Sequence, residues 1–230
     1  MAQLNVVRTY GYSEVVTVDG NASPLLYVAG LNVDADGSPR AYSPDSKSGL
    51  DDLANAGKPG NWWGVATDNN QPNGTPIIQG PNDPAPGFYV STTSLQNSNF
   101  PVSSPSRYVN AETINFIVLP IGFGQGVKVG DFAVVIDALT ADYDYAVYAD
   151  EGPSDQIGEG SMALAASLGY SSNPRNGGTG SGLVYVVFPG SSKGFPASQD
   201  AIDHQASGLF TNWGGLSQVK ACYPLLAWPE

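Results

Sequence analysis

The stretch DYDYAVYADEGPSDQIGEGSMALAASLG, residues 142–169, combines a predicted strand, a turn and a helix in one short segment. Its residues 145–149 (YAVYA) are mostly aromatic or β-branched, which predicts a buried strand. Glycine and proline within 151–158 predict the turn that ends it. Ser161 is a suitable N-cap for a helix over 162–168, and the glycine that follows is a suitable stop.

Two carboxylates flank this turn: Asp150 ends the strand, and Glu159 stands between Gly158 and Gly160. Strand, turn and returning segment can bring both side chains to one cleft, and the glycines allow close approach of the backbone. Hydrolysis of a glycosidic bond needs such a pair, one as acid and the other as base or nucleophile. The alternative is that both groups are solvated or cap the helix.

The composition predicts a mainly β protein with a single domain. The 230 residues are 41% hydrophobic and only 13% charged, with 28 glycines and 18 prolines, as is typical of short strands joined by many turns. Further strands are expected over 3–8, 13–18, 25–28, 88–92, 113–120, 130–137 and 183–188. Short helices are expected over 48–57 and 198–207, the second with Ser198 as N-cap.

The net charge of −12 argues against nucleic acid as a partner, because phosphates would be repelled and no basic cluster is present. A polycation is the complementary ligand. No run of apolar residues approaches the length of a membrane span. We therefore expect neither nucleic-acid nor membrane binding.

The sequence predicts no cofactor and no metal. Cys222 and His204 are the single cysteine and histidine, which argues against a zinc site, a disulfide and a Ser-His-Asp triad. Residues 32–37 (NVDADG) resemble the start of a calcium loop, but Ser43 stands where such a loop needs glutamate. No glycine-rich phosphate loop precedes a helix.

Other candidate positions lie outside the central stretch. Trp62 and Trp63 are adjacent, so in extended backbone they face opposite sides and at most one lines a sugar site. Asp131 and Asp137 stand at the two ends of a predicted strand, where they either face the barrel mouth or form turns. The Gly- and Ser-rich segment 171–181 is a candidate mobile wall of the cleft.

Several blocks of the chain resemble the family 75 glycoside hydrolases, the fungal-type endo-chitosanases and their bacterial relatives. They are LNVDADGSPRAYSPD (31–45), GLDDLANAGKPGNWWGVATD (49–68), DPAPGFYVSTTSL (83–95), YVNAETINFIVLP (108–120), GDFAVVID (130–137) and YAVYADEGPSDQIGEGSMALAASLG (145–169). The resemblance implies a six-stranded double-psi-like β-barrel with a few peripheral helices. It also implies a catalytic domain over 31–230, with leading strands in 1–30 packed on it.

The resemblance further implies hydrolysis of β-1,4 links between glucosamine units of chitosan, with inversion. Asp150 and Glu159 match the family's essential Asp and Glu, with Glu159 as acid and Asp150 as base. A nearby helix N-terminus would favour ionised Glu159, so the opposite assignment stays open. The candidate substrate-binding residues are Asp34, Asp36, Tyr42, Trp62, Asp131 and Tyr148.

We expect a secreted, monomeric enzyme of polysaccharide degradation whose signal peptide is absent from this chain, since residues 1–10 lack the signal-peptide pattern. A lone cysteine departs from those fungal enzymes that carry cysteine pairs, and indicates a bacterial relative. Two alternatives remain. The substrate could be peptidoglycan or another amino-sugar polymer, or the chain could be a non-catalytic polysaccharide-binding module.

Overall fold

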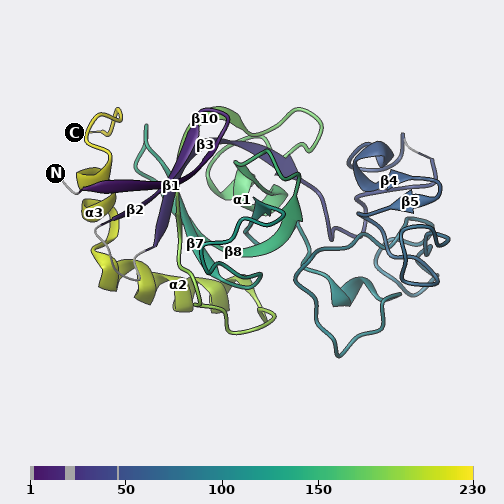
Figure 1. Ribbon diagram of the computed structural model, residues 1–230. Coiled ribbons are helices and arrows are strands. Elements are labelled where there is room, and N and C mark those ends of the chain that lie inside the picture. Colours follow the sequence, from purple (N-terminus) through teal and green to yellow (C-terminus); the bar gives the residue numbers. More distant parts are fainter. Residues whose placement is uncertain (1–2, 19–23, 46, 230) are drawn as a thin grey trace.

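The computed structural model describes residues 3–18, 24–45 and 47–229 (Figure 1). Within these ranges the fold is mainly β, with a closed barrel, an irregular lobe and three α-helices. The strands are β1 (Leu4–Tyr10), β2 (Ser13–Val18), β3 (Leu25–Asp34), β4 (Gly57–Lys58), β5 (Asn61–Trp62), β6 (Phe116–Pro120), β7 (Phe132–Asp137), β8 (Tyr143–Gly152), β9 (Glu159–Ser161) and β10 (Thr179–Val187). The helices are α1 (Met162–Ser167), α2 (Gln199–Trp213) and α3 (Gly215–Cys222).

Six strands close the barrel in the order β3, β10, β7, β8, β6 and β9, and β9 pairs again with β3. The β3–β9 and β6–β8 pairs are parallel, and the other neighbours are antiparallel. This confirms the expected single-domain fold with a six-stranded barrel. The β1–β2 hairpin extends the sheet from β3. Because β3 runs from Leu25 to Asp34, it crosses the expected boundary at residue 30.

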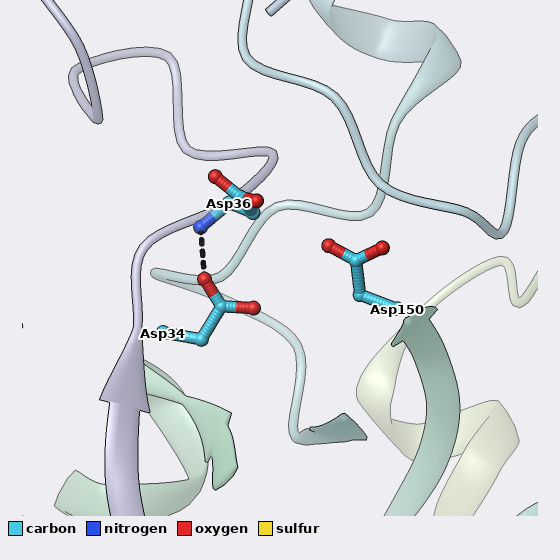
Figure 2. Close-up of side chains that lie close together, drawn as sticks. All are labelled: Asp34, Asp36 and Asp150. Carbon is cyan, nitrogen blue, oxygen red and sulfur yellow. Dashed lines mark hydrogen bonds between the residues drawn. The ribbon is translucent and has the colours of Figure 1, made fainter. Parts of the chain in front are cut away.

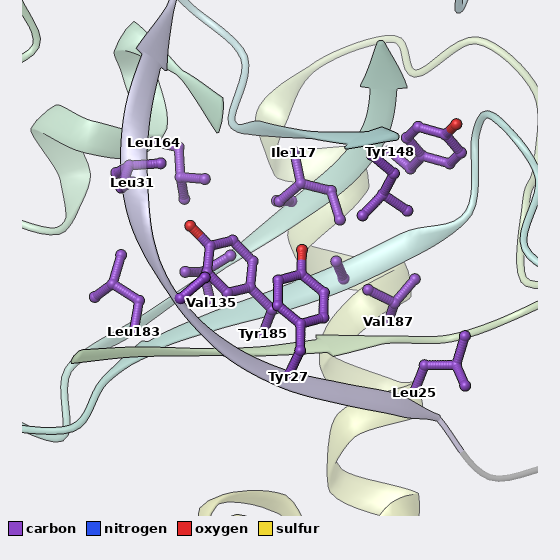
Figure 3. Close-up of a cluster of buried hydrophobic side chains, with 14 of the residues drawn as sticks. Leu25, Tyr27, Leu31, Ile117, Val135, Tyr148, Leu164, Leu183, Tyr185 and Val187 are labelled. Atoms are coloured by element: carbon purple, nitrogen blue, oxygen red, sulfur yellow. The ribbon is translucent and has the colours of Figure 1, made fainter. Parts of the chain in front are cut away.

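Alternating residues of the strands fill the barrel with apolar side chains, as the two-residue period of a strand requires (Figure 3). Tyr27 of β3 and Tyr185 of β10 stack at 4.6 Å between ring centroids, and neither ring is accessible to solvent. Ile117 and Tyr148 belong to the same cluster. The interior is therefore a packed core, and the polar chemistry has to lie elsewhere.

Helix α2 covers the outer face of β7 and β8, and α3 follows it near the two chain ends (Figure 1). Ser198 caps α2 as predicted, because its side chain accepts a hydrogen bond from the amide of Ala201. Ile202, Ala206 and Phe210 recur at helical spacing and are buried. No helix in the described ranges has the length and apolar character to cross a membrane.

The predicted strand and helix of the central stretch are confirmed as β8 and α1, and the predicted turn lies between β8 and the short strand β9. The Ser161 hydroxyl accepts hydrogen bonds from the amides of Leu164 and Phe116, so it both caps α1 and holds the start of β6. Gly158 has φ +91°, and a Cβ there would lie 2.7 Å from that of Ala29. Only glycine lets the chain enter β9 this close to β3.

Residues 35–115 form a lobe beside the barrel, between β3 and β6 (Figure 1). The helix predicted over 48–57 is wrong except for a 3-10 turn at Leu53–Ala56. The amides of Leu50 and Asp51 bond instead to the carbonyls of residues 40 and 41, so these residues do not make the hydrogen bonds of a helix. Segment 88–92 makes isolated bridges, such as Ile78 with Tyr89, rather than the predicted regular strand.

Candidate active site

A cleft of about 970 Å³ lies between the barrel and the lobe. The ends of β3, β6, β8 and β9 line one side, and lobe residues line the other. Six carboxylates line the cleft, and the one cation among the described lining residues is that of Arg175. The carboxylates are those of Asp34, Asp36, Asp51, Asp150, Glu151 and Glu159. The cleft is thus strongly acidic and large enough for an extended ligand.

Asp150 and Glu159 face the cleft from the two strands that flank β6. Val118 of β6 pairs with Asp150 of β8 on one side and with Glu159 of β9 on the other. Residues paired across a sheet share a face, and two strand spacings separate their Cα atoms by roughly 9–10 Å. The structure therefore brings the two predicted catalytic carboxylates onto one surface.

A β-bulge at Ala149 gives Asp150 this orientation. Ile117 pairs with Tyr148 and Val118 with Asp150, so β8 has one more residue than β6 between these pairs. Without the bulge, Asp150 would share the face of Tyr148 and point into the apolar barrel. The extra residue turns Asp150 outward. Tyr148 stays in the core (Figure 3).

The carboxylate of Asp150 is buried and held by three donors. The amide and the hydroxyl of Ser94 bond to Oδ1 at 2.9 and 2.6 Å, and the amide of Glu151 bonds to the same oxygen at 2.8 Å. Burial raises the pKa of Asp150 to about 6, while these hydrogen bonds act in the opposite direction. In the described structure all three donors bind Oδ1, which leaves Oδ2 to the cleft.

The carboxyl of Glu159 lies against the end of β8. A Cβ at Gly152 would come within 3.1 Å of its Oε2, so the glycine leaves room for this group. Burial first, and then the negative charges of Asp150 and Asp51, raise the pKa of Glu159 to about 7. At neutral pH this carboxyl is thus partly protonated, as a general acid requires.

Asp34 and Asp36 lie at the end of β3 and face Asp150 across a small space (Figure 2). One oxygen from each of the three carboxylates lies within 4.8 Å of the others, a spacing that could hold a cation. The Asp36 amide donates to Asp34 Oδ1 at 2.7 Å. Burial raises the pKa of Asp34 and of Asp36 well above the usual value, and the neighbouring carboxylates raise both further.

Two residues of the lobe complete this acidic surface. Tyr42 is buried, and its hydroxyl donates to the Asp36 carboxylate. Asp51 is also buried, and its Oδ2 accepts a hydrogen bond from the Asn55 side chain at 2.9 Å. Burial raises the pKa of Asp51. Tyr42 was expected at the site, whereas no pattern in the sequence singled out Asp51.

Three of the expected substrate-binding residues do not line the cleft. Trp62 is 7% exposed and packs in the lobe beside Tyr89. Asp131 is fully buried, and its carboxylate accepts the amides of residues 128, 190 and 192, so it organises a loop. Tyr148 packs in the apolar interior of the barrel, because the bulge at Ala149 places it on the opposite face of β8 from Asp150.

Trp63 and Arg175 line the cleft in their place. Trp63 is 59% exposed, and its indole Nε1 donates to the carbonyl of Asn55 at 2.7 Å, which fixes the ring. The guanidinium of Arg175 donates to the carbonyls of residues 49, 50 and 51 and pairs with the Asp52 carboxylate. It therefore ties segment 171–178 to the lobe. The adjacent tryptophans signalled this position, but sequence alone did not say which of them is exposed.

A buried pair of carboxylates with raised pKa values, set in an acidic cleft, gives the chain the features of a glycoside hydrolase. The model of one such family, described as fungal chitosanase of glycosyl hydrolase group 75, matches residues 91–212. The chain belongs to this family, as its sequence blocks indicated, and is a glycoside hydrolase of the chitosanase type. No curated protein matches the chain.

Proposed function

We propose that this protein is an endo-chitosanase that hydrolyses β-1,4 links between glucosamine units by an inverting acid–base mechanism. The observation that carries the proposal is the placement of Asp150 and Glu159 on either side of Val118, on one face of an acidic cleft. The two residues lie on strands separated by β6. This spacing suits inversion, in which the carboxyls are about 6.5–9.5 Å apart to admit a water, better than retention, in which they are about 5 Å apart.

The surroundings of the two carboxyls support Glu159 as acid and Asp150 as base. Glu159 has the higher pKa, because Asp150 is stabilised in its ionised form by three donors. The N-terminus of α1 directs the Leu164 amide at Ser161, not at Glu159. Asp150 Oδ2 takes a proton from a water molecule while the oxygen of that water attacks the anomeric carbon. Glu159 gives its proton to the departing glycosidic oxygen.

The acidic surface suits the 2-ammonium groups of deacetylated chitosan. Asp34, Asp36 and Asp150 converge within 4.8 Å, and a cation among them would stabilise their ionised forms. The exposed indole of Trp63 offers an apolar face on which a sugar ring can stack. We further propose a secreted protein that acts as a monomer, with the β1–β2 strands packed on a catalytic unit that includes the whole barrel.

The test is reducing-end release from highly deacetylated chitosan by the wild type, Glu159→Gln and Asp150→Asn. Asp155→Asn removes one charge from the exposed turn between β8 and β9 and is the matched control. Loss of more than about a hundredfold in the two folded site variants, with an unchanged control, supports the proposal.

Activity on purified sacculi without activity on chitosan would replace the substrate with peptidoglycan. Binding of chitosan without release of reducing ends would indicate a non-catalytic module. Full activity of either site variant would exclude that carboxylate as a catalytic residue. Inversion is tested separately by proton NMR, in which the first anomer released is α for an inverting enzyme acting on a β-link.

A further inference from the structure

Ser94 of the lobe is joined to the end of β8 at the β-bulge. The Leu95 amide donates to the carbonyl of Ala149, the bulged residue, at 2.8 Å. The neighbouring Ser94 then places both its amide and its hydroxyl on Asp150 Oδ1. The Ser94 hydroxyl oxygen also accepts the Glu151 amide at 3.2 Å. The bulge that turns Asp150 outward thus also offers the carbonyl that docks this lobe segment.

The segment that carries Ser94 is held rigidly from the lobe side. The buried hydroxyl of Thr93 donates to the carbonyl of Leu95 at 2.8 Å and accepts the amide of Val109 at 3.0 Å. These bonds fix the backbone on both sides of Ser94. Its hydroxyl is therefore placed by the lobe, although the carboxylate it binds belongs to the barrel.

The charged groups that face Asp150 are all carboxylates, and their repulsion would push its own carboxylate out of position. Asp34, Asp36 and Glu159 approach it from β3, from the loop after β3 and from β9, and Glu151 follows it on β8. Each carries negative charge when ionised. Tyr148, two residues before Asp150 on β8, is a further titratable neighbour. Against this repulsion, the described donors that hold Asp150 are the Ser94 hydroxyl and two amides.

We propose that Ser94 is a positioning residue for the general base: its hydroxyl holds Asp150 Oδ1, so that Oδ2 stays directed at the attacking water. This inference rests on the proposed function, because it assigns a base that acts on water. Ser94 lines the cleft, but its amide and its hydroxyl both donate to Asp150 Oδ1, so the proposed role acts through that carboxylate. Loss of Ser94 should therefore slow the reaction more than it weakens substrate binding.

The test compares kcat and KM on a chitosan oligomer for Ser94→Ala, Ser94→Cys and Ser94→Thr. Ser106→Ala, at an exposed serine of the same lobe, is the control. Removing one hydrogen bond to a buried charged group is expected to lower kcat about 10- to 100-fold. KM should change less than about twofold in Ser94→Ala and Ser94→Cys, because uniform binding is retained. Ser94→Thr keeps the hydroxyl and should recover most of kcat.

Circular dichroism establishes that each variant is folded, and Ser94→Cys provides the same test if Ser94→Ala does not fold. Wild-type kcat in either of these variants, or a loss expressed mainly in KM, overturns the positioning role and leaves the proposed function standing. Equal losses in Ser94→Thr and Ser94→Ala would also overturn it, because a hydroxyl is still present. An inactive wild type overturns the proposed function and this inference together.

Discussion

Replacing Glu159 with glutamine should stabilise the folded protein at neutral pH. The folded state raises the pKa of Glu159 from its usual 4.5 to about 7, chiefly through burial. Between these values the folded state binds more protons than the unfolded chain, so stability falls as the pH rises. This difference in pKa corresponds to about 3 kcal/mol of folding stability. The wild type loses that stability as the pH rises, and Glu159→Gln does not. At pH 4 the glutamate is mostly protonated in both states, so the variant gains little.

Thermal unfolding at pH 4 and pH 7.5 measures this effect. For a chain of this size, about 3 kcal/mol corresponds to a rise in Tm of roughly 6–12 °C. Asp155→Asn, in the exposed turn, is the control and should move Tm little at either pH. An equal gain at both pH values would show that packing, not ionisation, is responsible. A Tm at pH 7.5 at or below that of the wild type would refute the reasoning.

Three further outcomes are expected. The pH profile of kcat/KM should rise with ionisation of Asp150 near pH 6 and fall with deprotonation of Glu159 near pH 7, and an optimum above pH 8 would contradict these roles. Trp63→Ala should raise KM about tenfold with little change in Tm, because the Trp63 ring is exposed in the cleft. Trp62→Ala should cost about 3–5 kcal/mol of stability, because the Trp62 ring is buried. The reverse result would exclude Trp63 as a sugar-binding surface. Arg175→Gln should speed hydrogen exchange in segment 171–178 without global unfolding, because the guanidinium ties that segment to the lobe, and unchanged exchange would show that other contacts hold it.

The resemblance to family 75 implied the barrel topology, whereas the individual strands and helix caps could be predicted because their local signals agree with one another. The aromatic and β-branched run before Asp150 became β8, and Ser161 and Ser198 cap helices as expected. Here the strand period, the caps and the glycine stops all favour the same structure, so tertiary contacts have nothing to override. The candidate pair Asp150 and Glu159 also comes together as predicted, because a strand and its return segment flank β6.

The lobe and the finer site could not be predicted, because long-range contacts decide them. Asp51 lies in a segment with helical composition that pairs with residues 40–41 instead. Trp62 and Trp63 must face opposite sides, yet only the packing of Tyr89 shows which is buried. Tyr148 shares a sequence parity with Asp150, and the bulge breaks that parity without any glycine to signal it.

The division between barrel and lobe explains why the carboxylates have raised pKa values. A closed barrel fills its interior with apolar side chains, so its acidic residues face outward, where water would leave Asp150 and Glu159 with ordinary acidities. The lobe covers this face and removes it from water, which destabilises the protein at neutral pH. The proposed substrate, a polymer with one ammonium group per sugar, would supply the compensating positive charge. The burial that lowers the stability of the folded protein should therefore favour binding of a cationic polymer over a neutral one. Salt should reduce that preference.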